Sequence, residues 1–141
     1  MLYVREFEFF VDGDYITAEP CEGPGGATFG ENFEDAVESA ADWLSEFVDD
    51  ALMNGKTLTK STYGHDPRHG GRVVAVAVNR ELSDIPAMTA EDAARKLDVS
   101  HACIIQMIDE GLFDSWTDGR HCMVSRASVE ARKEEKLEAG H

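Results

Sequence analysis

The stretch TAEDAARKLDVSHACIIQMIDEG, residues 89–111, predicts two short helices joined by a tight turn. Thr89 has the side chain of a good N-cap for the first helix, and Ser100 has that of a good N-cap for the second. Asp98 and Val99 lie between the helices and are expected to form the turn. Helical spacing predicts one small buried face on each helix. These two faces are expected to hold Ala93, Ala94, Leu97, Ile104, Met107 and Ile108.

The sequence on either side extends this unit. The residues LFDSWTDGRHCMV (112–124) predict two short strands around an Asp118-Gly119 turn. Ser125 is expected to start a last, charged helix. Upstream, Ile85-Pro86 is an extended dipeptide, which we expect to close a linker over residues 81–88.

The N-terminal half begins with an alternating pattern, YVREFEFFVDGDYITAEP (3–20), which predicts a β-hairpin. Asp12-Gly13 is expected to be its two-residue turn, because glycine accepts positive φ without strain. A turn-rich break, CEGPGG (21–26), then precedes a short third strand, ATFG (27–30). One face of the first strand is expected to hold Tyr3, Arg5, Phe7, Phe9 and Val11, and the other Val4, Glu6, Glu8 and Phe10.

A long amphipathic helix is predicted next, over ENFEDAVESAADWLSEFVDDALMNG (31–55). Asn32 is expected to cap its start and Gly55 to end it. The apolar stripe comprises Phe33, Val37, Ala40, Leu44, Phe47, Val48 and Ala51. The opposite face comprises Glu34, Asp35, Glu38, Asp42, Glu46, Asp49 and Asp50, with no basic counterpart. Such a helix must gain its stability from the buried stripe, because like charges one turn apart repel.

A polar, flexible connection (56–71) leads to the strand RVVAVAVN (72–79), whose continuous apolar run favours a central place in the sheet. His65, Asp66 and His69 lie in this connection. They are not expected to bind a metal, because zinc sites use three or four protein ligands and no further ligand is near in sequence. The order β-β-β-α-β predicts an α+β unit, a small sheet covered on one face by a single helix.

Charge is distributed unevenly along the chain. From Glu6 to Gly55 there are fourteen Asp and Glu and no Lys or Arg. The part up to Pro86 has 6 basic and 17 acidic residues, net −11, and the rest has 7 and 11, net −4, which together give −15. Two interpretations stay open: a solvated acidic face, or a docking surface for a basic partner.

Composition also excludes several classes of protein. No apolar run is long enough to cross a membrane, and the N-terminus does not have the residue pattern of a signal peptide. The three scattered cysteines, Cys21, Cys103 and Cys122, are expected to be free thiols in a cytoplasmic protein. No Ser-His-Asp, Cys-His or phosphate-binding glycine motif is recognisable, so neither catalysis nor a cofactor or metal is expected.

The first half of the chain resembles the N-terminal domain of HicB-type antitoxins. The matching features are the hairpin with its Asp-Gly turn, the break rich in proline and glycine over residues 20–26, the strand that ends at Gly30, and the helix that opens with Glu-Asp-Ala and ends in Asn-Gly-Lys. The family usually has proline in the loop after the helix, where this chain has TLTKSTYGHDPRHGG. The resemblance implies a partial RNase H-like fold and a small basic ribonuclease of the HicA type as partner. The residues expected to face that partner are Glu6, Glu8, Phe10, Asp12, Asp14, Glu19, Glu38 and Asp42.

An RNase H-like fold raises the question of nuclease activity. Two-metal nucleases need several carboxylates that converge on one point. Glu6 and Glu8 share a face of the first strand, but no partner acid is identifiable on a later strand. We therefore expect a fold kept without its chemistry. A descendant that kept the chemistry would lose metal-dependent cleavage on mutation of Glu6 or Glu8.

The second half, residues 88–131, resembles the excisionase-type, MerR-like winged helix-turn-helix. The matching features are EDAARKL, DVS, IDEGLF and the wing glycine followed by Arg-His. The resemblance implies double-stranded DNA as ligand, although His101 and Gln106 stand where the family usually has basic residues. Arginine and lysine supply most of the affinity for phosphates, so a single copy is expected to bind weakly. The residues expected to contact DNA are Thr89, Arg95, Lys96, Ser100, His101, Ala102, Ile105, Gln106, Arg120 and His121.

The two resemblances together predict an antitoxin-like domain over residues 1–80, a linker over 81–88 and a DNA-binding domain over 89–141. Such a protein would neutralise its toxin and repress its own operon as a homodimer or homotetramer. Three alternatives stay open: a stand-alone regulator or excisionase-like factor whose first domain only oligomerises, a nuclease descended from RNase H, and a protein-interaction module that no longer reads DNA. Ile105 is ambiguous between a DNA contact and a protein contact, and His101 between a base contact and an ordinary surface residue.

Overall fold

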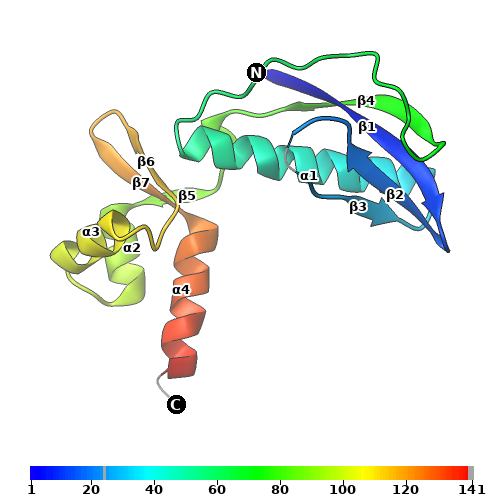
Figure 1. Cartoon of the computed structure of the whole chain (residues 1–141). Coiled ribbons are helices and arrows are strands. Elements are labelled where there is room, and N and C mark those ends of the chain that lie inside the picture. The colour runs from blue at the N-terminus through cyan, green and yellow to red at the C-terminus, as the bar shows by residue number, and fades with distance from the viewer. Residues whose placement is uncertain (24, 140–141) are drawn as a thin grey trace. The chain divides into compact units, whose positions relative to one another are not determined.

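The computed structural model describes residues 1–23 and 25–139 (Figure 1). Pro24 in the expected turn-rich break, and the last two residues of the expected DNA-binding domain, lie outside the described residues. The chain forms two compact units, one made of Met1–Ala51 and Thr57–Glu81, the other of Leu52–Lys56 and the residues from Leu82 onward. The α+β class is confirmed.

The first unit is a four-stranded antiparallel sheet with one long helix (Figure 1). Its elements are β1 (Leu2–Asp12), β2 (Tyr15–Pro20), β3 (Thr28–Gly30), α1 (Phe33–Met53) and β4 (Arg72–Asn79). The strand order is β3-β2-β1-β4, so the central position predicted for β4 is wrong. β1 is central instead, because its 11 residues pair with β2 on one side and with β4 on the other.

Side chains on β4 explain how an apolar strand can lie at the edge. Val74 lies directly across from Phe7, and Phe7 packs edge-on against Trp43 of α1 with ring centroids 5.7 Å apart. The face with Val74 and the 5% exposed Val76 is therefore the helix-covered face. The alternate positions are the small residues Ala75 and Ala77, and both are exposed.

α1 begins where the sequence predicted. The Asn32 side chain accepts a hydrogen bond from Asp35 N at 2.8 Å, and the Asp35 carboxylate accepts one from Glu31 N at 2.9 Å. The buried stripe is displaced from the predicted one, because Ala36 lies in the core while Phe33 is 41% exposed. The buried residues of α1 are Ala36, Ala40, Leu44, Val48 and Ala51. The acidic face was predicted to have no basic counterpart, but the Arg80 guanidinium binds the Asp49 carboxylate through two contacts of 2.8 and 2.9 Å.

The second unit contains four helices, one of them 3₁₀, and a three-stranded sheet ordered β5-β7-β6. Its elements in chain order are η1 (Leu82–Asp84), β5 (Ala87–Thr89), α2 (Ala90–Leu97), α3 (His101–Asp109), β6 (Ser115–Asp118), β7 (His121–Ser125) and α4 (Arg126–Ala139). The segment 81–88, predicted to be a linker, instead contains η1, most of β5 and the buried Ile85. Arg126 N also donates to the Pro86 carbonyl at 2.9 Å, which ties this segment to the start of α4.

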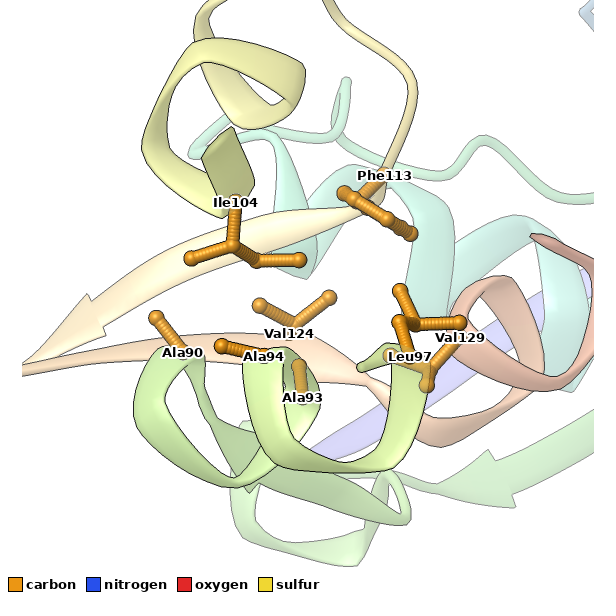
Figure 2. Packing of buried hydrophobic residues seen from close by; sticks show 8 residues of the cluster. All are labelled: Ala90, Ala93, Ala94, Leu97, Ile104, Phe113, Val124 and Val129. Atoms are coloured by element: carbon orange, nitrogen blue, oxygen red, sulfur yellow. The ribbon is translucent and has the colours of Figure 1, made fainter. Parts of the chain in front are cut away.

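The core of the second unit gathers small residues of α2 around Val124 of β7 (Figure 2). Ile104 of α3 and Val129 of α4 are fully buried in it, and Phe113 closes one side (Figure 2). Met107 and Ile108 are partly buried and pack against the cluster, as predicted. Ser125 lies before α4 and its hydroxyl accepts a hydrogen bond from Ser128 N at 3.2 Å.

Both hairpin turns lie one residue later than predicted. β1 ends at Asp12 and β2 begins at Tyr15, so the two turn residues are Gly13 and Asp14. Gly13 has φ 63°, whereas Asp14 does not have a positive φ, and this combination identifies a type II′ turn. The β6–β7 hairpin repeats the arrangement, with Gly119 at φ 62° in the first turn position.

Cys21, Cys103 and Cys122 are free and half-buried. Among the described residues, no helix combines the length and the apolar character that crossing a membrane requires.

Candidate nucleic-acid interface

The pair α2 and α3 is held in place by side-chain caps at both helix starts. The Thr89 hydroxyl accepts from Asp92 N at 3.2 Å, and the Ser100 hydroxyl accepts from Cys103 N at 3.1 Å. Between the helices, Asp98 adopts φ 55°, ψ 50°, a left-handed conformation that reverses the chain. Thr89 and Ser100, predicted as DNA contacts, therefore have a structural role that positions α3.

α3 presents a short polar face to solvent. Ile104 points into the core, and Ala102, Gln106 and Asp109 are exposed on the opposite side of the helix, whereas His101 is exposed in its first turn. The Gln106 amide donates to the Glu110 carboxylate at 3.3 Å. Ile105, predicted to be exposed, is partly buried and packs against the core, which removes much of its side chain from any ligand.

Basic side chains lie on the elements around α3. Arg95 and Lys96, both exposed on α2, contact acidic neighbours: Arg95 pairs with Asp92, and Lys96 Nζ lies 3.8 Å from a Glu130 carboxylate oxygen. Exposed ion pairs of this kind are weak, so both cations stay available to phosphates.

The hairpin of β6 and β7, which is the wing of this domain, supplies further cationic or polar groups. Arg120 lies at its turn and His121 at the start of β7, and both are exposed. Arg126, at the start of α4, was missed by the sequence reasoning. It lines a hollow of about 510 Å³ together with Trp116 and Asp118 of β6. The sequence indicates its role only through its position, one residue after the last strand of the wing, β7.

The candidate site for a protein partner is less exposed than predicted. The Glu8 side chain is 4% exposed, and its carboxylate accepts three backbone hydrogen bonds, from Arg68 N at 2.7 Å, His69 N at 2.8 Å and Gly71 N at 2.9 Å. Burial raises the pKa of the Glu8 carboxyl, but these three donors outweigh burial and leave the pKa below its usual value.

Glu6 and Phe10 are covered by the same connection. Glu6 accepts from the backbone and from the ring of His65, at 3.1 and 2.7 Å, and these hydrogen bonds lower the pKa of its carboxyl. The Phe10 ring stacks on His69 with centroids 4.3 Å apart. The connection 56–71, predicted to be flexible, is thus fastened to β1, where it encloses Glu6 and Glu8 and covers one face of the Phe10 ring. Asp12, Asp14, Glu38 and Asp42 are exposed, and Glu19 is half-buried beside His69.

A second acidic residue lies next to Glu8 in the sheet. Glu19 of β2 lies directly across from Glu8 in the β1–β2 register, so a partner acid that the sequence analysis did not identify is present. It points instead to His69, whose Nε2 lies 2.7 Å from its carboxylate. Within the described residues, no three His, Cys, Asp or Glu side chains are grouped so as to hold a metal ion, His65 and His69 included.

Comparison with known proteins gives one match. Residues 87–137 match the family model of a helix-turn-helix domain, and no curated protein or solved structure shows significant similarity to the chain. The match begins at β5 and continues into α4, so it covers both helices and the wing described above. The resemblance of the first half to HicB-type antitoxins and to an RNase H-like fold stays a prediction. The C-terminal part of this chain is a helix-turn-helix domain, the kind of module with which proteins bind DNA.

Proposed function

We propose that the protein binds an operator through α3 and the β6–β7 wing and thereby regulates transcription. The observation that carries this proposal is the exposed face of α3, where Ala102 and Gln106 stand opposite the buried Ile104 and His101 is exposed at the helix start. A glutamine amide can form two hydrogen bonds with the edge of adenine, and an alanine methyl can contact that of thymine. The basic side chains of α2 and the wing would contact phosphates and set the position of α3.

The test is selection of double-stranded DNA by the full chain, followed by affinity measurements on the enriched sequence. Gln106→Ala should lose discrimination at one base pair, worth about 1–3 kcal/mol. Arg120→Ala should weaken all sequences equally and reduce the slope of log affinity against log salt by about 0.9. The control is Arg132→Ala, which removes a half-buried cation of α4 that pairs with Glu135. Failure to enrich any sequence at low salt would overturn the proposal.

We further propose that the first unit docks a small basic protein, as an antitoxin docks a HicA-type ribonuclease. The specific observation in favour is the acidic face of α1, where Glu38, Asp42 and Glu46 are exposed. Single-sign surfaces attract partners of opposite charge and accelerate their association. The docking surface would include Asp12 and Asp14 but not the covered Glu6 and Glu8, and no catalytic role is assigned to this unit.

Co-expression with the product of each adjacent open reading frame tests this second proposal. A small basic product should co-purify with the tagged chain and arrest growth when expressed alone. Glu38→Gln combined with Asp42→Asn should slow its association, while Glu134→Gln combined with Glu138→Gln on α4 should not. If neither neighbour binds, the antitoxin role is excluded for those genes while the DNA proposal is untouched.

A further inference from the structure

β4 leaves one long side of its backbone unpaired. Within residues 1–23 and 25–139, β4 pairs only with β1, through eight consecutive residues without a bulge. The opposite edge strand, β3, is only 3 residues long. Natural proteins protect edge strands with charges, proline, bulges or short length. Between Val73 and Val78, β4 has none of these protections.

The hydrogen-bond pattern shows which backbone groups point outward. Arg80 N donates to Met1 O at 3.0 Å, in line with the register that sets Leu2 opposite Asn79. Hydrogen-bonded pairs alternate in an antiparallel ladder, so the even-numbered residues of β4 face β1. The N–H and C=O groups of Val73, Ala75 and Ala77 therefore point away from the sheet. Cys21 N, which donates to Glu6 O at 2.9 Å on the other side of β1, fits the same alternation.

We propose that β4 pairs antiparallel with β4 of a second copy of this chain, around a two-fold axis at Ala75. A strand that pairs with itself in this way is self-complementary, because both copies offer the same donors and acceptors. Ala75 would exchange two hydrogen bonds with Ala75 of the second copy, and Val73 would exchange two with Ala77 of the second copy, at each end.

The side chains of β4 favour the pairing centred on Ala75 over the pairing shifted by one residue. On the exposed face, the centre brings two small alanines together, so nothing bulky separates the strands. On the helix-covered face, Val74 comes opposite Val76 of the second copy and extends the row of valines across the boundary. A shift of the axis by one residue, to Val76, would set Arg72 opposite Arg80 of the second copy, and like charges directly opposite are unfavourable.

Sedimentation velocity on the full chain without DNA tests the proposal. The wild type should sediment as a dimer. Ala75→Pro should raise the dimer dissociation constant on the order of a hundredfold, because it removes one outward donor from each copy and leaves two carbonyls unpaired. Ala75 N–H has no acceptor within its own sheet, so proline removes no hydrogen bond from the single copy. Ala75→Thr, which keeps the N–H and favours strands, should remain dimeric.

A second variant and a second measurement keep the test decisive if Ala75→Pro does not fold. Ala75→Lys places two like charges directly opposite each other, so its dimer should be weaker than the wild-type dimer and should recover as salt is added. Amide hydrogen exchange should show slow exchange at Val73 and Ala77 in the wild type and fast exchange in Ala75→Lys at low salt. A monomeric wild type, or variants that stay as dimeric as the wild type, would overturn the pairing. Neither result depends on whether the protein binds DNA.

Discussion

At the scale of single residues, Glu8 is the side chain that holds the first unit together beyond its sheet. Its carboxylate accepts N–H groups from three residues of a connection that the chain reaches only some 60 positions later. Each hydrogen bond to a charged acceptor contributes about 1.5–3 kcal/mol, and an unsatisfied buried donor is costly. Together with Glu6, which binds His65, and Glu22, which binds Thr62, this side chain replaces the regular pairing that residues 57–71 lack.

Glu8→Gln should lower the free energy of unfolding of the first unit by about 2–3 kcal/mol, because the amide nitrogen cannot accept the N–H groups that one carboxylate oxygen binds. Urea unfolding followed by Trp43 fluorescence measures this, in a Trp116→Phe background so that only the first unit reports. Glu34→Gln, at an exposed position of α1, is the matched control and should change the free energy of unfolding by less than about 0.5 kcal/mol. Equal stability of the two variants would mean that the connection does not depend on Glu8.

Acid should destabilise the first unit. The carboxyl pKa values of Glu6, Glu8 and Glu22 are all held below the ordinary glutamate value of 4.5. For Glu22 the cause is a pair of hydrogen bonds from Thr62. A carboxyl whose folded pKa is depressed stabilises the fold fully above its unfolded pKa, and this stabilisation is lost as pH falls through the folded pKa.

Unfolding followed by Trp43 should therefore become easier as pH falls below about 4.5, while stability between pH 6 and pH 8 is insensitive to these three groups. The control is Glu8→Gln, which lacks one of the three titrating carboxyls. Its loss of stability between pH 5 and pH 3 should be smaller than that of the wild type. A wild type whose stability rises on acidification in this range would contradict the assignment.

At the scale of elements, local and long-range features differ in how well sequence predicts them. The starts of α1, α2 and α3 were predictable because a cap such as Asn32 or Ser100 acts within three residues. The edge position of β4 was not, because apolar residues at 72–79 are equally compatible with a strand covered on both faces. The role of Glu8 was also hidden, since it depends on a connection far away in sequence.

In the candidate nucleic-acid interface, too, local features could be predicted from the sequence and long-range packing could not. The exposed positions Ala102 and Gln106 follow from helical periodicity once Ile104 is placed inward, whereas His101, three residues before Ile104, is exposed in the first turn of α3. The partial burial of Ile105 does not follow from periodicity, because it depends on how Phe113 and the wing pack. Both hairpin turns lie one residue later than predicted, because an Asp-Gly pair is compatible with two types of turn. In the first hairpin, only the pairing of Asp12 with Tyr15 distinguishes the two types.

The acidic end of α3 is an element-scale feature that opposes DNA binding. Asp109 is exposed on the same face as Gln106, two residues before the helix-ending Gly111. Asp109→Asn should raise the affinity for all DNA sequences by a similar factor, since it removes repulsion from phosphates and not a base contact. Fluorescence anisotropy with the selected and a scrambled duplex measures both affinities, with Glu138→Gln on α4 as control. A gain restricted to one sequence would instead place Asp109 against a base.

At the scale of the whole molecule, charge couples the two proposed functions, DNA binding and partner docking. The part of the chain up to Pro86 has a net charge of −11, and the helix-turn-helix part has −4. A molecule of net charge −15 repels DNA at long range, and the repulsion is screened over about 30 Å at 0.01 M salt but over only 10 Å at 0.1 M. A basic protein bound to the first unit would remove part of this repulsion, so partner and operator are expected to favour each other's binding.

This coupling can be tested without the partner by neutralising α1. Glu38→Gln, Asp42→Asn and Glu46→Gln together remove three charges at exposed positions of α1. The triple variant should bind the selected duplex several-fold more tightly than the wild type at 0.01 M salt, and the difference should shrink toward 0.1 M salt as screening increases. Circular dichroism and a Trp43 unfolding profile at least as stable as that of the wild type serve as controls for folding, because the variant also removes repulsion along α1. An affinity gain that is constant with salt would point to a change in conformation, and no gain at low salt would show that the acidic unit exerts no field on the DNA site.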